Sequence, residues 1–384
     1  MSRSLGRVAT RFFEFNNPKK PLPLRVGGKL SRFTLAYEMY GRMNADKSNV
    51  ILLFHAMTGS QHAAGLNRNV PGLNGRWTEE LHEGWWDAFI GPGKALDTRK
   101  FCVICANYLG GCYGSTGPAS INPQTGNPWG PTFPVVRLID IVESQLKLLD
   151  SLGVKKLHAV IGGSIGGYLS LLLATRYPER VKTVVPIGTG VETTINHRIL
   201  NFEQISAIES DVLFQGGDYY AGPRPDTGLA LARRIAHKIF VSPDTLRERA
   251  RSEVVSHKPP HGWYEMNHPV ESYMLHQGIK FVARFDANTY LRIADAWQWF
   301  DLVAEAGAVD FHDLFKRCQQ QEFLVFSIDS DVAFPLHDQS KLVHLLKPAH
   351  VPVIWITVHS EKGHDSFLLE PRLFTPHLVQ ALNH

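Results

Sequence analysis

Residues 157–177 read LHAVIGGSIGGYLSLLLATRY and carry the pattern that decides the fold. The run 157–161 is continuously apolar, which is typical of a strand buried on both faces of a sheet. A glycine-rich turn follows at once, and residues 168–177 have helical spacing of apolar side chains. Gly-x-Ser-x-Gly between a strand and a helix predicts a sharp, strained turn that exposes the hydroxyl of Ser164. A phosphate-binding loop is the alternative interpretation of such a glycine-rich turn.

Further apolar runs of the same kind predict a mostly parallel sheet; they lie at 50–54, 101–105, 184–187, 323–326 and 353–356. Between the runs at 101–105 and 157–161, apolar residues fall at helical spacing, and Gly153 marks the expected end of that helix. Strands that alternate with helices predict an α/β fold with helices on both faces of the sheet.

The stretch between the runs at 184–187 and 323–326 has a different character. It contains few β-branched runs and several helical patterns, such as residues 228–240. We therefore expect an α/β core formed by residues 1–190 and 301–384, interrupted by a helical lid at 191–300.

Composition excludes several classes of protein. The 384 residues are 44% hydrophobic and 20% charged, and no apolar run reaches the roughly 18 residues that a membrane helix needs. Lys plus Arg minus Asp plus Glu gives 40 − 36 = +4, too small and dispersed an excess to indicate nucleic-acid binding. The chain has four cysteines, and its single C-x-x-C pair, Cys102 and Cys105, lies inside an apolar run with no second such pair to complete a zinc site. So few cysteines in a chain of this length predict no disulfide framework, so we expect no metal and a reducing, cytoplasmic location.

An exposed serine of this kind needs a base and an acid, which in such folds follow it in the order acid, then histidine. His364 comes shortly after the run that starts at residue 353 and is the candidate base. The acid should follow the run at 323–326, where Asp329 and Asp331 both fit. Either aspartate could instead cap a turn, and the residues alone leave the choice open.

The amides that would stabilise an oxyanion should come from two places. Ile165 follows the serine at the start of a helix, where the N–H groups and the helix dipole favour negative charge. Met57 lies in His55-Ala56-Met57-Thr58-Gly59, directly after the first apolar run. The Met57 and Ile165 N–H groups are the predicted donors, and an ordinary glycine turn with a packed His55 is the alternative.

A set of motifs in one order from about residue 30 to 370 resembles the homoserine O-acetyltransferase family. They are His55-Ala56-Met57-Thr58-Gly59, Trp85-Trp86-Asp87, Gly91-Pro92-Gly93-Lys94, Leu96-Asp97-Thr98, Asn107-Tyr108-Leu109-Gly110-Gly111-Cys112-Tyr113-Gly114-Ser115-Thr116-Gly117-Pro118, Gly162-Gly163-Ser164, Arg284-Phe285-Asp286-Ala287-Asn288 and Gly363-His364-Asp365-Ser366-Phe367-Leu368. The resemblance implies an α/β-hydrolase fold with a helical lid. It also implies acyl transfer from acyl-CoA to an amino-acid hydroxyl.

The resemblance implies a role for five residues. Ser164 falls on the family's nucleophile, His364 on its base, and Asp331 on its acid, since Asp331-Val332-Ala333-Phe334-Pro335 matches the segment that follows the family's aspartate. Arg233 and Asp365 fall on the residues that hold the amino acid. A guanidinium and a carboxylate suit the two charged ends of such an acceptor. Without the resemblance, a solvated helix arginine and a turn aspartate would be the simpler interpretations.

The resulting hypothesis is an L-homoserine O-acetyltransferase of methionine biosynthesis that works by ping-pong acyl transfer. In the family, succinyl users carry arginine two residues beyond the catalytic aspartate and acetyl users tend to carry leucine, whereas this chain has Ala333, which matches neither. Acetyl-CoA is still the expected donor, because the second carboxylate of a succinyl group would lack a cation there. His337 could supply one only if it were protonated and pointed inward. Alternatives are a homoserine or serine O-succinyltransferase and a thioesterase or esterase with the same triad. A binding module without activity is disfavoured because all triad positions are filled. We expect small-molecule substrates, no cofactor and a homodimer.

Overall fold

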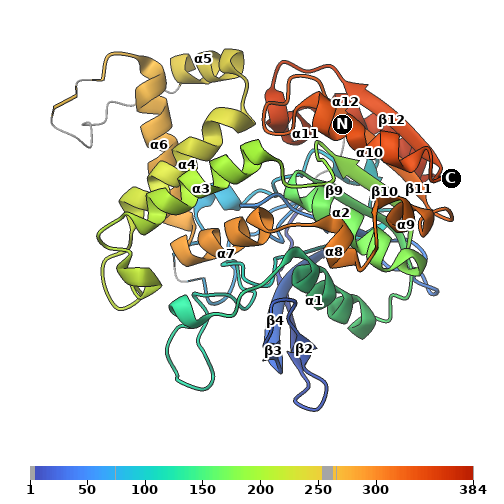
Figure 1. Cartoon of the computed structure of the whole chain (residues 1–384), viewed down its shortest axis with the longest axis horizontal. Coiled ribbons are helices and arrows are strands. Elements are labelled where there is room, and N and C mark those ends of the chain that lie inside the picture. The colour runs from blue at the N-terminus through green and yellow to red at the C-terminus, as the bar shows by residue number, and fades with distance from the viewer. Residues whose placement is uncertain (1–4, 74, 253–262, 265, 384) are drawn as a thin grey trace.

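The computed structural model describes residues 5–73, 75–252, 263–264 and 266–383. Its centre is a sheet of eight strands among these residues, in the order β1-β4-β8-β5-β9-β10-β11-β12 (Figure 1). The strands are β1 (Arg11–Asn16), β4 (Arg32–Tyr40), β8 (Cys102–Ala106), β5 (Val50–Phe54), β9 (Leu157–Gly163), β10 (Val181–Ile187), β11 (Glu322–Ile328) and β12 (Val353–Val358). β4 pairs antiparallel with both β1 and β8. The strands β8, β5, β9, β10, β11 and β12 pair parallel, each with the next in this list. Two short ribbons pair β2 (Leu22–Pro23) with β3 (Lys29–Leu30) and β6 (Ile90–Gly91) with β7 (Leu96–Asp97).

Helices cover both faces of this sheet, as the apolar runs predict. The core helices are α1 (Leu138–Ser151), α2 (Ile165–Arg176), α8 (Leu302–Ala306), α9 (Phe311–Lys316), α10 (Leu336–Leu346), α11 (Ser366–Leu369) and α12 (Pro371–Leu382). The pleat of a strand sends successive side chains to opposite faces. Accordingly, Leu52 and Phe54 of β5 pack in the cluster that contains α1 and α2, and Ile51 and Leu53 pack in the cluster that contains α12.

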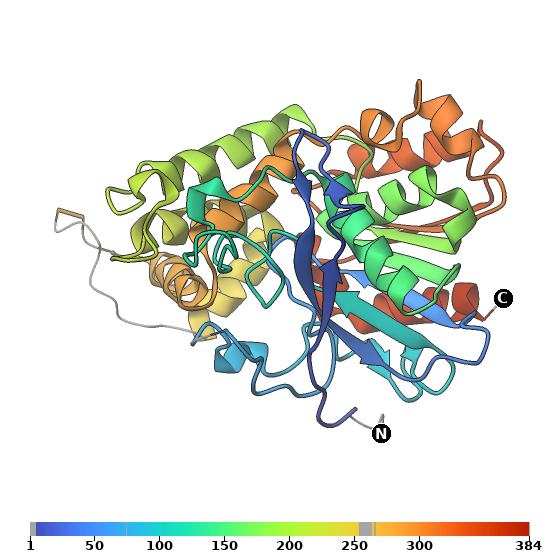
Figure 2. The same ribbon diagram turned by 90° about the horizontal axis from the view of Figure 1, so that it is seen from below.

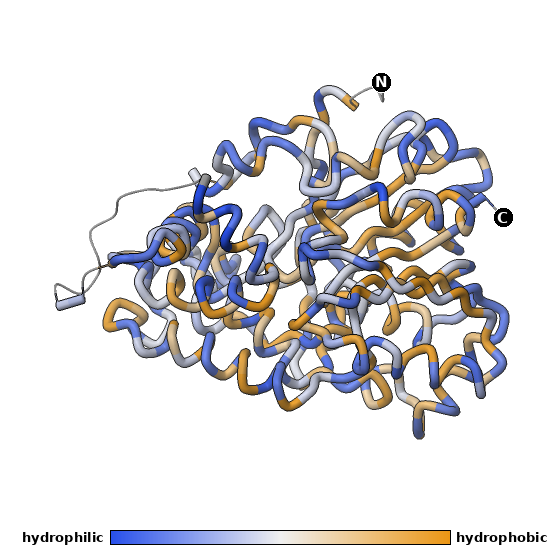
Figure 3. The backbone as a smooth tube through the Cα atoms, turned by 90° about the horizontal axis from the view of Figure 1, so that it is seen from above, coloured by the Kyte–Doolittle hydropathy of each residue, from blue (hydrophilic) through white to orange (hydrophobic). Residues whose placement is uncertain are grey.

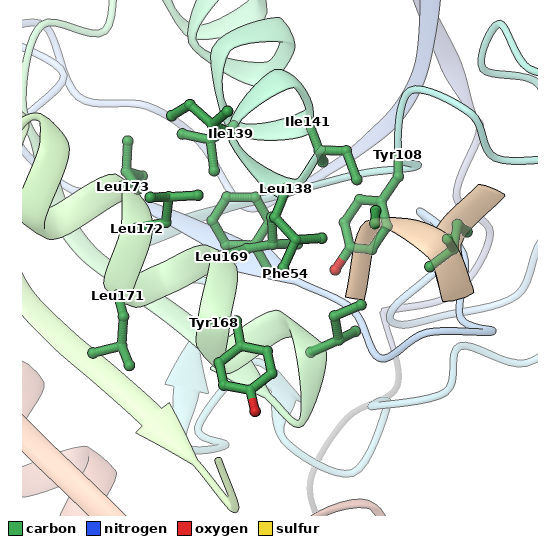
Figure 4. Close-up of a cluster of buried hydrophobic side chains, with 14 of the residues drawn as sticks. Phe54, Tyr108, Leu138, Ile139, Ile141, Tyr168, Leu169, Leu171, Leu172 and Leu173 are labelled. Carbon is green, nitrogen blue, oxygen red and sulfur yellow. The ribbon is translucent and has the colours of Figure 1, made fainter. Parts of the chain in front are cut away.

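Helix α2 lies wholly inside the core. Every residue from Ile165 to Thr175 is buried, which fits a helix that has no polar face. Figure 4 shows Leu169 of this helix gathered with Leu138 of α1 and Phe54 of β5. Each buried leucine contributes about 2 kcal/mol of hydrophobic stabilisation, so the segment after Ser164 is held rigidly.

Residues 191–300 form helices, with no strand among those described. They are α3 (Ile195–Glu209), α4 (Asp226–Phe240), α5 (Pro243–Ser252), α6 (Pro269–Arg284) and α7 (Ala287–Gln298). α4 packs against α3, α6 and the turn η5 (Gly363–Asp365), so these helices sit over the end of the sheet that carries His364. Figure 2 shows this helical group on one side of the strands. Part of the chain between α5 and α6 lies outside the described residues.

Two features differ from the sequence prediction. The run at 353–356 forms β12, but Ile354 and Trp355 are 51% and 37% exposed, so this strand is not buried on both faces. The reason is its place at the sheet edge, where it pairs on one side with β11. The antiparallel strands β1 and β4 at the other edge were not predicted, because their mixed polar and apolar residues do not form a continuous run.

Apolar residues concentrate along the strands of the sheet and in the helices around them (Figure 3). Among the described helices, none combines the length and the apolar character needed to cross a bilayer.

Candidate active site

The turn at Ser164 has the strained geometry that the sequence predicts. Ser164 links β9 to α2 with φ 59° and ψ −128°, a backbone conformation that residues other than glycine rarely adopt. A Cβ at Gly162 would lie 2.0 Å from the carbonyl oxygen of Gly166, and one at Gly166 would lie 2.5 Å from that of Phe54. Glycine at both positions therefore allows the helix, the turn and β5 to approach closely.

His364 and Asp331 meet in a buried pair. His364 Nδ1 lies 2.6 Å from Asp331 Oδ2, and both side chains are almost completely shielded from solvent. β11 and β12 are parallel neighbours, so the loops after their carboxyl ends bring the two residues together. Asp329 points elsewhere, because its carboxylate lies 2.7 Å from Nδ1 of the exposed His359.

The geometry also fixes the state of the His364 ring. Since a carboxylate only accepts, the Nδ1 proton faces Asp331, which leaves Nε2 as the free lone pair of the neutral ring. Burial opposes protonation, but the charges of Asp331 and Asp365 outweigh it and raise the pKa of His364 above its ordinary value. His364 Nε2 has no hydrogen-bond partner among the described residues, and His364 lines the same cavity as Ser164.

The loop after β5 presents the Met57 amide in a defined direction. Gly59 N donates to Ala56 O at 2.9 Å, and His55 Nδ1 donates to the same oxygen at 2.7 Å. Burial lowers the pKa of His55 to about 4, so its ring is neutral at pH 7. In a trans peptide the C=O and the following N–H point in opposite directions, so anchoring Ala56 O turns the Met57 N–H the other way.

The second amide belongs to Ile165, the first residue of α2. Neither the Met57 N–H nor the Ile165 N–H has an acceptor within the described part of the chain. Two free amides beside Ser164, one of them at a helix N-terminus, are suited to stabilise a developing oxyanion.

Ser164, His364 and Met57 line one cavity of about 190 Å³. Its remaining walls are mostly apolar and aromatic, with backbone from the loop after β5. The lining residues are Ala56, Met57, Thr58, Gly59, Trp85, Ser164, Arg233, Phe240, Arg284, Trp297, His364, Asp365, Phe367 and Leu368.

Two opposite charges face this cavity, and neither has a hydrogen-bond or ion-pair partner in the part of the chain that the structure describes. The Arg233 guanidinium, from α4, lies 5.0 Å from the Phe281 ring centroid and makes no hydrogen bond or ion pair with a described residue. The Asp365 carboxylate, from η5, is equally unpaired among the described residues. Burial raises the pKa of Asp365, opposed by the positive charges of His364 and Arg233. Such a pair suits a ligand that carries one anionic and one cationic end.

A second cavity, of about 290 Å³, adjoins the first. The two share Thr58, Gly59, Trp85, Arg233 and Arg284 as lining residues, and the second extends outward past Lys280. The space around Ser164 therefore continues between α6 and the loop after β5. In the described residues no group of three or more His, Cys, Asp or Glu side chains is arranged to hold a metal ion.

Comparison with known proteins places the chain in a family. A family model described as the alpha/beta hydrolase fold matches residues 49–354. A homoserine O-acetyltransferase from Methanohalobium evestigatum is 41% identical over 383 residues, covering 100% of this chain and 75% of that protein. The chain belongs to the homoserine O-acetyltransferase family of the α/β-hydrolase fold.

Other members and neighbours of the family carry different names. A homoserine O-succinyltransferase from Alkalilimnicola ehrlichii is 40% identical over 379 residues, covering 97% of this chain and 94% of that protein. The crystal structure of esterase E22 superimposes with a TM-score of 0.86 at 26% identity, covering 98% of this chain and 100% of that chain. The residues of the site must therefore decide between donors and between transfer and hydrolysis.

Two residues that bear on the donor lie away from the cavity. Ala333 is 3% exposed, does not line the cavity and accepts a hydrogen bond through its carbonyl oxygen from His197 Nε2 at 2.7 Å. His337 is 79% exposed at its side chain and lies 3.3 Å from Asp338. Neither residue offers a cation to a donor carboxylate in the cavity.

Sequence reasoning missed much of the cavity wall. Phe240 and Trp297 line it from α4 and α7, yet their spacing is that of ordinary core residues. Arg284 belongs to a motif that supported the resemblance, but no role followed from the motif itself. Its placement beside Arg233 depends on how α4 packs on α6, which local sequence does not encode.

Proposed function

We propose that this protein transfers an acetyl group from acetyl-CoA to the hydroxyl of L-homoserine. The observation that carries the proposal is the position of Arg233 and Asp365. Both line the cavity of Ser164 and His364, and neither has an ion-pair partner among the described residues. A homoserine zwitterion would place its carboxylate on the guanidinium and its ammonium on the carboxylate. Its side-chain hydroxyl would then reach toward Ser164.

In the first half-reaction, His364 Nε2 accepts the Ser164 hydroxyl proton as the serine oxygen attacks the thioester carbonyl. The Met57 and Ile165 amides stabilise the tetrahedral oxyanion. The carbon–sulfur bond breaks, and His364 returns the proton to the CoA thiolate. Asp331 holds the ring in place and stabilises its protonated form.

In the second half-reaction, His364 accepts the proton of the homoserine hydroxyl, whose oxygen attacks the acyl-serine. The ester bond to Ser164 breaks and the serine recovers its proton. Because Arg233 and Asp365 fix the acceptor, its hydroxyl competes effectively with water.

The second cavity is the proposed route for the thiol arm of the donor. The cavity around Ser164 has room for the acyl group and the amino acid, and the continuation past Lys280 leads outward. No cofactor or metal takes part in these steps.

Acetyl-CoA is preferred over succinyl-CoA on electrostatic grounds. A succinyl group would bring a second carboxylate into the cavity, and a buried unpaired charge costs several kcal/mol. Arg233 is reserved for the acceptor, and Arg284 is already paired with Glu80. Use of succinyl-CoA is the second candidate, since relatives of equal similarity bear both names.

The decisive assay measures CoA release for acetyl-CoA and succinyl-CoA, each with homoserine, serine or no acceptor. The proposal expects acetyl-CoA with homoserine to exceed every other combination. Equal release without acceptor would instead favour a thioesterase, for which two unpaired charges have no use.

We further propose a cytoplasmic enzyme of methionine biosynthesis that acts as a homodimer. Four free, buried cysteines support a reducing compartment. Apolar side chains exposed on α3 support a dimer contact.

A further inference from the structure

In the loop after β5, every second backbone carbonyl from residue 56 to residue 60 accepts a hydrogen bond from a side chain. Ala56 O accepts from His55 Nδ1 at 2.7 Å, and Ser60 O accepts from Trp85 Nε1 at 2.9 Å. The middle one, Thr58 O, accepts from Arg284 Nη1 at 3.4 Å. His55 and Trp85 belong to the core, whereas Arg284 is the last residue of α6 in the helical group 195–298.

Arg284 is itself fixed from several directions. Its Nη1 also donates to the Tyr113 hydroxyl at 2.7 Å, its Nε pairs with Glu80, and its guanidinium lies 5.1 Å from the Phe281 ring centroid. Arg284 and Tyr113 come from two motifs of the sequence that the proposed reaction leaves without a role. They meet at the loop that carries Met57.

The contact with Thr58 is connected to the Met57 amide through two peptide groups. Thr58 O and Gly59 N belong to one trans peptide, so holding the oxygen toward Arg284 directs the Gly59 N–H the opposite way. That N–H donates to Ala56 O at 2.9 Å and closes a β-turn. Ala56 O and Met57 N belong to a second trans peptide, so the turn bond that anchors Ala56 O also fixes the direction of the Met57 N–H. Met57 lines the same cavity as Ser164.

We propose that Arg284, braced by Tyr113, is a positioning residue that sets the direction of the Met57 amide and makes the oxyanion hole depend on the docking of α6. The proposal rests on the proposed use of that amide in acyl transfer. It assigns Arg284 to the loop rather than to a substrate carboxylate. Its charge is compensated by Glu80, whereas Arg233 in the same cavity has no carboxylate partner among the described residues.

The test compares two ketones of similar shape, of which only one forms an oxyanion in the site. A short alkyl trifluoromethyl ketone forms a tetrahedral adduct with a serine and needs the oxyanion amides, whereas the matching methyl ketone binds without forming it. The variants are Arg284→Met, Arg284→Lys and Tyr113→Phe. The matched control is Arg292→Met, which removes another arginine that donates to a backbone carbonyl, Pro131 O, at 3.1 Å.

Arg284→Met should slow acylation of Ser164 by acetyl-CoA about 10- to 100-fold at saturating donor, below the loss seen when an oxyanion donor itself is removed. Affinity for the trifluoromethyl ketone should fall by a similar factor, while the methyl ketone affinity and the donor KM stay within about 3-fold of wild type. Tyr113→Phe should shift the same quantities in the same direction by less. Arg284→Lys should restore part of the loss, and Arg292→Met should match wild type.

Equal loss of both ketones, or an unchanged trifluoromethyl ketone affinity, would overturn the inference. So would a rise confined to the acceptor KM, which would make Arg284 a substrate ligand. If Arg284→Met fails to fold, the ketone comparison in Tyr113→Phe decides alone. A wild-type enzyme that never acylates Ser164 would refute the proposed function, whereas normal acylation in all variants would refute only this inference.

Discussion

At the scale of single residues, the site separates two tasks. Ser164, His364 and Asp331 carry the groups that any acyl transfer to serine needs, and an esterase would need the same ones. Arg233 and Asp365 add two charges that face the cavity without partners among the described residues. Both residues are half-buried. Because a charge that is partly removed from water is stabilised by an opposite charge, their presence indicates a ligand that pairs with them.

Removing one of these charges should affect the acceptor and spare the donor. Arg233→Met should lower kcat/KM for homoserine by a factor that corresponds to about 2–4 kcal/mol, as expected when a carboxylate loses its charged partner. The burst of CoA from acylation without acceptor should persist. Arg234→Met, the neighbouring arginine outside the cavity lining, is the control and should behave like wild type. Loss of the CoA burst in Arg233→Met would contradict the assignment.

The pH dependence of acylation reports the charge around His364. A general base must be neutral, so the rate falls as the pH drops through its pKa, which lies above the ordinary value of a histidine. Asp365→Asn removes one of the negative charges that raise this pKa. The acid limb of kcat/KM for acetyl-CoA should therefore move to lower pH. An unmoved limb would mean that Asp365 does not act on His364.

At the scale of elements, continuous apolar runs predicted the parallel strands, because strands buried on both faces need no polar positions. The same logic failed at β12, where the sheet ends and apolar side chains are left partly exposed. The choice of Asp331 came from the family resemblance. It depends on which loop residue turns back toward His364, and residue types alone do not decide that.

The start of α1 provides a test of buried charge. Glu305 of α8 accepts from Ile139 N at 2.7 Å at the N-terminus of α1, and burial raises its pKa from 4.5 to about 7. The folded state therefore holds the proton more tightly, and this stabilising contribution is complete below pH 4.5 and lost as the pH rises to about 7.

Glu305→Gln keeps an acceptor for Ile139 N without the charge. Its free energy of unfolding should exceed that of wild type by about 3 kcal/mol at pH 8, and the difference should vanish near pH 4. Denaturant unfolding at both pH values measures this. Glu209→Gln, at the exposed end of α3, is the control, and parallel pH profiles for Glu305→Gln and wild type would contradict the prediction.

At the scale of the whole molecule, the sequence predicted a helical segment but not how it closes the site. The packing of α4 and α6 brings Arg233 and Arg284 to one cavity. Another helix of this segment, α3, leaves apolar side chains exposed. Ile195, Ile199 and Phe202 follow one face of α3 and are 71%, 53% and 64% exposed. Such a patch is typical of a protein–protein contact.

The proposed homodimer uses this face of α3. Phe202→Asp should raise the dimer dissociation constant at least about 10-fold, because a charge would be buried in an apolar contact. Sedimentation velocity over a range of concentrations measures the change. Val212→Asp, which alters an exposed apolar residue beyond the end of α3, is the control. An unchanged sedimentation profile for Phe202→Asp would exclude this contact.

The central claim is that an acetyl group passes through Ser164 on its way to homoserine. Mixing the enzyme with acetyl-CoA and no acceptor, followed by peptide mass spectrometry, tests it directly. The account predicts one acetyl group on the peptide that contains Ser164, and its transfer to the homoserine hydroxyl when the acceptor is added. Ser164→Ala should show neither event. An unmodified Ser164 in an enzyme that still acetylates homoserine would contradict the account.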